Sequence, residues 1–313
     1  MDYLYIIIGI ILLILSGNYL VKSSSNLAKY FKIPPIIIGV TIVSFGTSAP
    51  ELFVSASASL NGLSDVAIGN AIGSNIANLG LVLGLSALIV AVPIKKSLIK
   101  LDYSVLMFSA ILFGVLALDY KITRLDGAIL ILAMLIYIFI IIRLLKKNKI
   151  ETAETEEESQ QKIYHPFVSL LIIIASCGGL VFGSDFLVDG AVSLATKMGV
   201  SERIISLTVV AIGTSLPELT TSVIAAIKRN FDISIGNVVG SNIFNTLFIV
   251  GTSACINPLT VNPSTLKIDY PAMLIFYVLL GVFFLPVKRL RISRFEGLIL
   301  IIAYVIYSYI IFS

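Results

Sequence analysis

Charged residues are scarce in this chain of 313 residues. They make up 13% of the sequence, while hydrophobic residues make up 58% and the mean hydropathy is +1.02. A soluble globular domain carries roughly 25% charged residues, so this balance excludes an ordinary soluble protein and indicates an integral membrane protein. The net charge of +4 does not point to nucleic acid as a partner, because the basic residues lie in short loops between apolar segments.

Cysteine and histidine are also scarce. The two cysteines, Cys177 and Cys255, both lie within apolar runs, so we expect small buried side chains and no disulfide framework. The single histidine, His165, lies in the longest hydrophilic stretch, and we expect it at the surface. The apolar runs are long and continuous, which excludes the alternating strands of a membrane β-barrel. We expect no cofactor.

Ten apolar segments are long enough to cross a lipid bilayer, which takes roughly 17–25 residues each. The first begins at Tyr3, after Met1 and Asp2, without the basic leader of a signal peptide, so we expect it to remain as a first helix. The predicted spans are residues 3–21, 34–60, 66–92, 103–119, 126–142, 166–187, 203–227, 233–256, 271–287 and 296–312.

One short motif occurs twice, 167 residues apart, and each copy places a glutamate inside an apolar span. The copies are Gly-Thr-Ser-Ala-Pro-Glu at residues 46–51 and Gly-Thr-Ser-Leu-Pro-Glu at residues 213–218. A second motif, Gly-Asn-x-x-Gly-Ser-Asn-Ile-x-Asn, keeps the same offset at residues 69–78 and 236–245. A carboxylate in hydrocarbon costs at least about 2.5 kcal/mol and is normally kept for a function. The doubled glutamate therefore predicts a cation site at the bilayer midplane of a transporter.

The repeat extends over both halves of the chain. Lys100 matches Lys267 at the 167 offset, and near the end of each half the offset becomes 170. Each unit has five spans, and because five is odd, the two units must insert in opposite orientations. The predicted fold is an all-α membrane protein with ten transmembrane helices in two inverted five-helix repeats, with helices 2, 3, 7 and 8 discontinuous at the polar motifs. The predicted units are residues 1–142 and 166–313, joined by a linker at residues 143–165.

The basic residues of the loops predict the orientation. One set of alternate loops holds 17 of the 22 basic residues and the other set holds 5, so the richer set should be cytoplasmic. We therefore expect a multi-pass protein of the cell (inner) membrane, with both termini outside and the linker in the cytoplasm. The linker carries five glutamates between residues 151 and 158. This acidic run predicts a solvated, flexible loop, with a regulatory calcium site as the alternative.

The two motifs carry the oxygen ligands that a metal cation needs. Ca²⁺ binds about 6–8 oxygens from carboxylates, carbonyls, amides and water. The prolines that precede the two glutamates have no N–H, which frees a backbone carbonyl about one turn earlier, near Gly46 and near Gly213. The candidate side-chain ligands are the carboxylates of Glu51 and Glu218, the amides of Asn78 and Asn245, and the hydroxyls of Thr47, Ser48, Ser74, Thr214, Ser215 and Ser241.

The charge of this site narrows the choice of substrate. Two ionised glutamates carry a charge of −2, which matches one Ca²⁺, and two or three Na⁺ ions could share the same oxygens instead. A site that cannot hold both ions at once makes an antiporter by competition. Because one chain supplies both halves of the site, we expect a monomeric functional unit.

The two pairs of motifs resemble the α-repeats of the sodium/calcium exchanger branch of the cation/calcium exchanger superfamily, and the ten-span plan resembles its short prokaryotic members. The resemblance implies that Glu51 and Glu218 are central ligands shared by Ca²⁺ and Na⁺, completed by Asn78 and Asn245. It implies roles at the flanking Na⁺ sites or in backbone coordination for Thr47, Thr214, Ser48, Ser215, Ser74, Ser241, Ser44 and Ala211. It also implies alternating access by sliding of the first and sixth spans, which contain Gly17 and Gly183.

The chain departs from some archaeal and potassium-dependent relatives, which carry aspartate where this chain has Asn245. That difference argues against potassium co-transport, although a potassium-dependent exchanger stays an alternative, as does a proton/calcium exchanger on the same fold. The proton branch typically has a Gly-Asn-x-x-Glu motif, which is absent here. A channel is disfavoured because channels usually gather their pore from several subunits. An intramembrane serine hydrolase is disfavoured because no histidine or lysine lies near Ser48 or Ser215 in sequence, and we do not expect the chain to be an enzyme.

Overall fold

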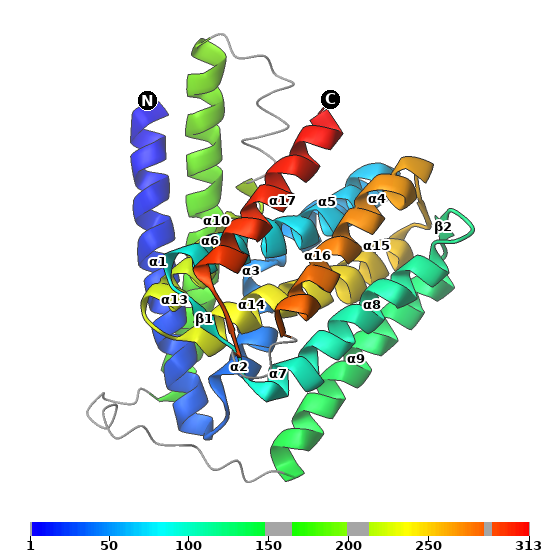
Figure 1. The fold of residues 1–313 in the computed structure, drawn as a ribbon. Helices are drawn as coiled ribbons and strands as arrows, with labels where there is room; N and C mark the ends of the chain where they lie inside the picture. Colours follow the sequence, from blue (N-terminus) through cyan, green and yellow to red (C-terminus); the bar gives the residue numbers. More distant parts are fainter. Residues whose placement is uncertain (1, 148–164, 199–212, 285–289, 313) are drawn as a thin grey trace.

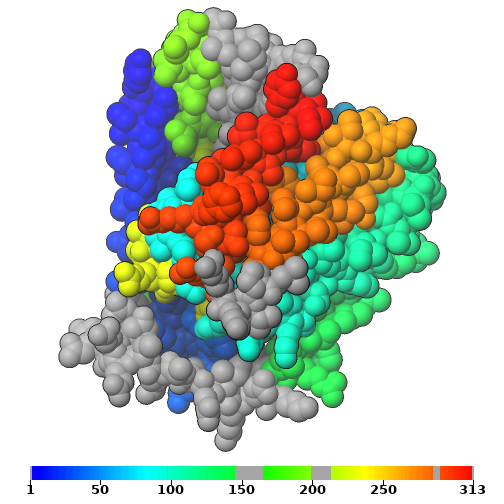
Figure 2. Space-filling model, viewed as in Figure 1, coloured from blue at the N-terminus to red at the C-terminus, as the bar shows by residue number. Residues whose placement is uncertain are grey.

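The computed structural model describes residues 2–147, 165–198, 213–284 and 290–312. Within these ranges the regular secondary structure is helical apart from four two-residue strands, and short turns and loops join the elements. Two long helices, α1 (Asp2–Phe31) and α10 (Pro166–Lys197), lie side by side along one edge of the molecule, and the other helices form a larger bundle beside them (Figure 1). In the space-filling view, the C-terminal helices α16 and α17 cover the near face of that bundle (Figure 2).

The remaining elements follow the repeat. The first half contains α2 (Pro35–Ile38), η1 (Gly39–Val43), α3 (Ser44–Thr47), α4 (Ala49–Leu60), α5 (Ser64–Ala77), η2 (Asn78–Leu83), α6 (Gly84–Ile89), β1 (Val92–Pro93), α7 (Lys96–Lys100), α8 (Asp102–Leu116), β2 (Lys121–Ile122) and α9 (Arg124–Lys147). The second half contains α13 (Leu216–Ile227), α14 (Phe231–Phe244), η5 (Asn245–Ile249), α15 (Val250–Ile256), β3 (Leu259–Thr260), η6 (Thr265–Asp269), α16 (Tyr270–Phe284), β4 (Arg291–Ile292) and α17 (Arg294–Phe312). The η segments are stretches of π-helix.

Eight helices in the described ranges are long and apolar enough to cross a membrane, and one bent pair of helices brings the number to nine. The chain is thus an all-helical membrane protein. The second predicted span is the bent pair, with an angle of 48° between residues 35–47 and 49–60. Pro50 lies within the first turn after the bend and cannot donate a hydrogen bond to the turn before it. Of the seventh predicted span, residues 203–212 lie outside the described residues, and α13 is the remainder.

The prediction of discontinuous third and eighth helices was wrong. Residues 64–89 and residues 231–256 each form one continuous helix. The polar motif is accommodated by a π-helical segment inside each helix, which begins at Asn78 in the first half and at Asn245 in the second. A π-helical turn widens the helix by one residue and is frequent at functional sites, so the backbone adapts without a break.

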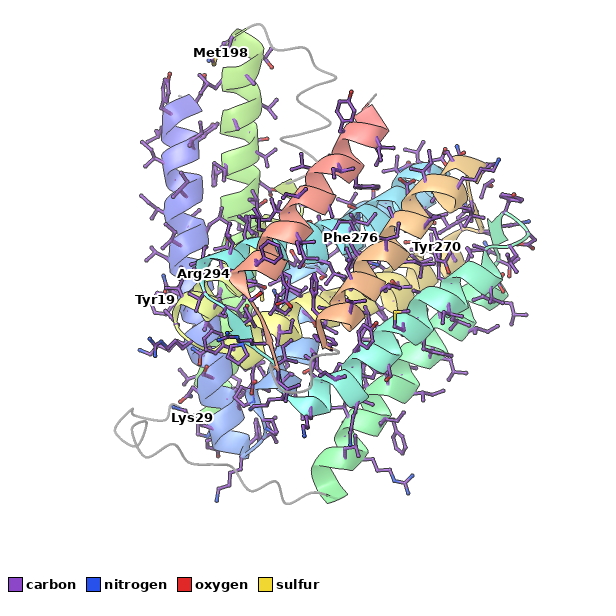
Figure 3. The ribbon with its side chains drawn as sticks, in the orientation of Figure 1. Tyr19, Lys29, Met198, Tyr270, Phe276 and Arg294 are labelled. Carbon is purple, nitrogen blue, oxygen red and sulfur yellow. The ribbon has the colours of Figure 1, made fainter. Side chains whose placement is uncertain are left out.

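Equivalent residues of the two halves make equivalent contacts across the molecule. The guanidinium of Arg124 donates to the carbonyl of Ile256 at 3.3 Å, and that of Arg294 donates to the carbonyl of Ile89 at 3.0 Å (Figure 3 labels Arg294). The strands are exchanged in the same way, because β1 pairs with β4 and β2 pairs with β3, both antiparallel. Each two-stranded sheet therefore takes one strand from each half of the chain.

The tyrosines of the bundle repeat this pattern. The Tyr103 hydroxyl donates to the carbonyl of Tyr277, and the Tyr270 hydroxyl (Figure 3) donates to the carbonyl of Ala110, both at 3.1 Å. Each hydroxyl packs against a glycine of the other half, Gly281 and Gly114 respectively. A larger residue at either glycine would collide with the tyrosine that the other half supplies.

The helices α1 and α10 are joined along their length. Gly9 lies against the backbone of α10 at Gly183 and Leu187, which brings the two helices into close contact. At one end, the Lys197 ammonium forms an ion pair with the Asp2 carboxylate. The two glycines that were expected to suit sliding face different neighbours, because Gly183 packs on α1 while Gly17 packs on α13.

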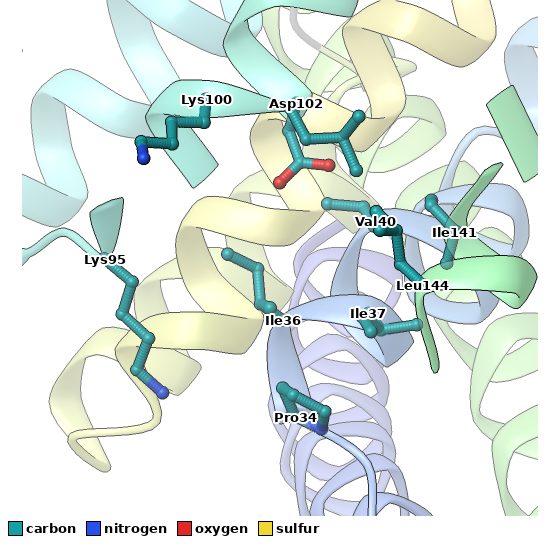
Figure 4. Close-up of a pocket in the computed structure, with 10 residues that line it drawn as sticks. Pro34, Ile36, Ile37, Val40, Lys95, Lys100, Asp102, Ile141 and Leu144 are labelled. Carbon is teal, nitrogen blue, oxygen red and sulfur yellow. The ribbon is translucent and has the colours of Figure 1, made fainter. Parts of the chain in front are cut away.

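A pocket of about 470 Å³ opens between the start of the second span, the loop before α8 and the end of α9 (Figure 4). Its walls are mainly apolar, and the buried carboxylate of Asp102 faces it while accepting a hydrogen bond of 2.7 Å from Tyr137. Lys95 lies at its edge and forms an ion pair of 2.5 Å with Asp232. The pocket is lined by residues other than the predicted ion ligands.

Candidate functional site

The two motif glutamates occupy matching places in the fold. Glu51 is the third residue of α4 and Glu218 is the third residue of α13, and both helices begin with a proline in the first turn. Both carboxylates are fully buried, at 0% exposure. A carboxylate in the first turn is favoured by the exposed N–H groups and the dipole of the helix N-terminus. The local sequence therefore holds each glutamate at a helix start inside the bundle.

The structure brings the two halves together at these helix starts. The Ser48 hydroxyl donates to Oε1 of Glu218 at 2.8 Å, and the Thr47 hydroxyl donates to Oδ1 of Asn237 at 3.0 Å. Because Ser48 immediately precedes α4, its bond brings the helix start that carries Glu51 to the helix start that carries Glu218. The predicted association of the two motifs is found in the fold.

The cluster is rich in buried polar atoms without a hydrogen-bond partner in the part of the chain that the structure describes. They include both carboxylate oxygens of Glu51, Oε2 of Glu218, and the whole side-chain amides of Asn78 and Asn245. All four residues are 0% exposed. An unpaired buried polar group costs about 1–3 kcal/mol, and native proteins leave few of them. A concentration of such oxygens matches the donor set that binds Ca²⁺ or Na⁺.

Two serines of the cluster also have buried side-chain oxygens without a hydrogen-bond partner. The hydroxyls of Ser215 and Ser241 are buried and have no partner among the described residues. Ser74 is 5% exposed and lies one turn before the unpaired amide of Asn78. The described residues contain no group of three or more His, Cys, Asp or Glu side chains that could hold a metal. A cation here would therefore be held by two carboxylates together with amide and hydroxyl oxygens.

Two asparagines of the second motif were not predicted as site residues, yet they support the glutamates. Nδ2 of Asn70 donates to the carbonyl of Glu51 at 3.1 Å and to the Ser55 hydroxyl at 2.9 Å. Nδ2 of Asn237 donates in the same way to the carbonyl of Glu218 at 3.4 Å and to the Ser222 hydroxyl at 3.0 Å. The signal was present in the sequence, because both asparagines belong to the repeated motif.

Comparison with known proteins places this geometry in a family. The family model for "Sodium/calcium exchanger protein" matches residues 1–143 and 168–313. The chain belongs to the sodium/calcium exchanger family. The putative antiporter CaxA of Alkalimonas amylolytica is 35% identical over 99% of this chain and 98% of that protein. The sodium/calcium exchanger MaX1 of Methanosarcina acetivorans is 30% identical over 99% of this chain and 98% of that protein.

A solved structure of another family member has the same fold. The sodium-calcium exchanger NCX_Mj, soaked with 2.5 mM Na⁺ and 1 mM Sr²⁺, superposes with a TM-score of 0.83 and 32% sequence identity. The match covers 100% of this chain and 98% of that chain. The fold and the sequence therefore give the same family assignment.

Three other predicted site residues supply no unpaired buried atom that the structure describes. The Ser44 carbonyl accepts a hydrogen bond of 2.9 Å from the N–H of Ser48, and the Ser44 hydroxyl donates to the carbonyl of Thr41. Thr214 is only partly buried. Ala211 lies outside the described residues. These positions stay predictions that depend on the family resemblance.

In the second half, the backbone carbonyl that was expected to be free is hydrogen-bonded. The Gly213 carbonyl accepts a hydrogen bond of 2.5 Å from the hydroxyl of Ser184 on α10. Pro217 cannot donate to it, so α10 supplies the missing donor. This bond ties α10 directly to the residues that immediately precede α13 and Glu218.

Proposed function

We propose that this chain is a secondary antiporter that exchanges Na⁺ for Ca²⁺ by alternating access, as its family and the names of its relatives suggest. The observation that carries the proposal is the group of fully buried, unpaired oxygens around Glu51 and Glu218. A buried carboxylate without a partner is costly, and a bound cation would supply the missing partner.

The proposed central ligands are the carboxylates of Glu51 and Glu218 and the amide oxygens of Asn78 and Asn245. Their complete burial and missing partners support this assignment. The proposed flanking Na⁺ ligands are Thr47, Ser48, Ser74, Ser44, Thr214, Ser215, Ser241 and Ala211. The Ser48–Glu218 hydrogen bond supports a role for this serine beside the central carboxylate.

Competition between the two ions follows from the charge of this cluster. Two carboxylates balance one Ca²⁺, and the same oxygens can bind Na⁺ ions in its place. If one ion must leave before the other binds, movement of Na⁺ down its gradient can drive Ca²⁺ the other way. Exchange of this kind requires one shared set of ligands that opens alternately to the two sides of the membrane.

We propose the ten-span architecture with two inverted repeats, residues 1–142 and 166–313, and a cytoplasmic linker at residues 143–165. The matched contacts of Arg124 and Arg294 and the exchanged strands support equivalent roles for the two halves. The loop charges support both termini outside. The crossing of the motifs within one chain supports a monomeric functional unit.

Flux in proteoliposomes tests the function. Vesicles containing the purified protein receive external ⁴⁵Ca²⁺ under an imposed gradient of Na⁺, K⁺ or H⁺, with ionophores setting the membrane potential. We expect Ca²⁺ uptake to follow the outward Na⁺ gradient and to be insensitive to K⁺ or pH gradients. Uptake that follows the pH gradient instead would identify a proton/calcium exchanger, and a requirement for K⁺ would identify the potassium-dependent class.

A further inference from the structure

A second group of buried polar side chains joins the two helices that carry the repeated asparagine motif. Asn75 on α5, Asn242 on α14 and Thr246 in η5 are each at most 3% exposed. Asn75 and Asn242 are equivalent residues of the two halves, 167 positions apart. None of the three is among the ion ligands proposed above. We call Asn75, Asn242 and Thr246 the junction residues.

Three hydrogen bonds connect the junction residues. Nδ2 of Asn75 donates to the hydroxyl oxygen of Thr246 at 2.8 Å. The Thr246 hydroxyl donates to the carbonyl of Asn242 at 3.0 Å. Nδ2 of Asn242 donates to the carbonyl of Asn75 at 3.1 Å. The first and the third of these bonds cross from one half of the chain to the other.

The acceptors fix which way the two side-chain amides face. A backbone carbonyl can only accept, so the nitrogen of Asn242 must face the Asn75 carbonyl. The single hydroxyl hydrogen of Thr246 is given to Asn242, so its oxygen must face the nitrogen of Asn75. Oδ1 of each asparagine is then left without a partner among the described residues. Side chains kept for stability alone would not need to leave two buried oxygens unpaired.

The helix α16 packs against the junction residues. The sulfur of Met273 accepts a weak hydrogen bond of 3.5 Å from Nδ2 of Asn75. Tyr277, one turn later, lies beside Thr246 and Asn242, although its hydroxyl makes no hydrogen bond of good geometry within the described ranges. Both α16 side chains are 0% exposed. The junction is therefore enclosed by α5, α14, η5 and α16.

The two carbonyls that the junction binds are hydrogen-bonded to the proposed ion ligands. The backbone N–H of Asn78 donates to the carbonyls of Asn75 and of the residue before it. The N–H of Asn245 donates in the same way to the carbonyls of Asn242 and of the residue before it. Asn78 and Asn245 are also the first residues of the π-helical segments η2 and η5. A side-chain donor at these carbonyls therefore acts on the turn from which each ligand amide projects.

The two halves use different donors for these carbonyls. In the second half, Thr246 serves the Asn242 carbonyl from the next turn of its own helix. The equivalent residue of the first half is Leu79, which is 0% exposed and has no side-chain donor. The Asn75 carbonyl receives its donor from Asn242 instead. A threonine at position 246 is thus not required by the repeated fold, which suits a more specific role.

We propose that Asn75, Asn242 and Thr246 are positioning residues for the ion cluster. They hold the carbonyls to which Asn78 and Asn245 are bonded, and so keep both π-helical segments formed and both ligand amides directed at the cluster. Without these bonds each segment relaxes toward an ordinary α-helix, which has a tighter turn and rotates the amide. This inference rests on the proposed function, in which the two amides are central Ca²⁺ ligands.

Calorimetric titration of the purified full chain in detergent tests the proposal. Thr246→Val keeps the shape of threonine and removes both of its junction bonds, whereas Thr246→Ser keeps the hydroxyl. Residues that orient metal ligands typically change metal affinity 10–100-fold, so we expect Thr246→Val to raise the Ca²⁺ dissociation constant by about 10–100-fold. Thr246→Ser should restore a value close to wild type. The control is Ser109→Ala, which removes a buried hydroxyl that donates to a carbonyl of its own helix α8, and should leave the constant unchanged.

Competition with Na⁺ separates positioning from a loss of folded protein. The proposed flanking Na⁺ ligands are other residues than the two amides, so Thr246→Val should weaken Na⁺ binding much less than Ca²⁺ binding. A loss of folded protein would instead lower the number of binding sites per chain and leave both constants unchanged. Asn75→Leu breaks the same bond from the other side. Adding it to Thr246→Val should therefore cause less further loss than it causes alone.

An unchanged Ca²⁺ constant in Thr246→Val, equal weakening of both ions, or a serine variant that behaves like the valine variant would overturn the positioning role. If Thr246→Val and Asn75→Leu both fail to fold while Ser109→Ala folds, the junction serves stability and the proposal falls. Glu51→Gln tests the ion site separately. Lost Ca²⁺ affinity in Glu51→Gln with an unchanged constant in Thr246→Val would remove only the junction, and normal affinity in Glu51→Gln would remove the site itself.

Discussion

Ser48 donates a hydrogen bond of 2.8 Å to Glu218, which lies 170 residues further along the chain. The bond joins the bend of the second span to the helix start that carries the other half's glutamate. It shows that the cluster is built between the two halves, with neither half complete alone.

Replacing either glutamate with glutamine should abolish Ca²⁺ transport. Glu51→Gln or Glu218→Gln leaves one negative charge against a divalent cation in a fully buried cluster. We expect ⁴⁵Ca²⁺ flux in proteoliposomes to fall at least 100-fold, roughly the effect of about 3 kcal/mol. Glu296→Gln is the control, because that carboxylate caps α17 through Ser293 and lies away from the cluster. Wild-type flux in both cluster variants would contradict the assignment.

Na⁺ should weaken Ca²⁺ binding in the detergent-solubilised protein. The two ions share oxygens in the proposed site, so their binding free energies are coupled, and the coupling is reciprocal. Isothermal titration calorimetry with Ca²⁺ at increasing Na⁺ should give an apparent affinity that falls steadily, with choline as the matched salt. A Ca²⁺ affinity that stays constant across the Na⁺ series would show that the ions bind at separate, uncoupled places.

Close contact between α1 and α10 should make Gly9→Ala destabilising. A Cβ at Gly9 would lie 2.6 Å from the backbone nitrogen of Leu187 and 2.8 Å from the carbonyl oxygen of Gly183, so the helices must separate. Overpacking of this kind costs about 1–3 kcal/mol. The control is Gly178→Ala on α10, where a Cβ meets no described atom within 4 Å and should be neutral or stabilising by up to about 1 kcal/mol. Melting temperatures in detergent should separate the two variants, and equal melting temperatures would argue against close packing.

The two equivalent tyrosine–aspartate pairs should contribute unequally to stability, because one is buried and the other is only partly buried. Tyr137 donates to Asp102 at 2.7 Å, and its repeat equivalent Tyr307 donates to Asp269 at 3.0 Å. Asp102 is 6% exposed, whereas Asp269 is only partly buried and can recruit water more easily. Tyr137→Phe should therefore cost about 1–3 kcal/mol and Tyr307→Phe less. Thermal unfolding in one detergent gives the ranking, and a larger loss for Tyr307→Phe would reverse the argument.

Much of the site could be predicted because the sequence states it twice. A single Pro-Glu pair in an apolar run has many explanations, but the constant offset of Glu51 and Glu218 indicates one cluster built from two halves. Complete burial of the central asparagines agrees with that prediction. The same repeat also indicated that Asn70 and Asn237 support the glutamates, since each asparagine lies 19 residues beyond the glutamate whose carbonyl it contacts.

Other features depend on tertiary contacts that the sequence does not reveal. The polar motif at Asn78 predicted a break, but a π-helical turn keeps the helix continuous. The Gly213 carbonyl was expected to be free, but Ser184 comes from a different helix to occupy it.

The exchanged strands also constrain how the protein is made. Val92 in β1 pairs with Ile292 in β4, which is 200 residues later. These two strands therefore cannot pair until the ribosome has synthesised nearly the whole chain. A nascent chain stopped after its first half would display two orphan strand edges, which invite mispairing with other chains. Pairing of these strands is therefore a late step in the folding of this transporter. The unpaired strand edges of a truncated chain are a feature that cellular quality control can recognise.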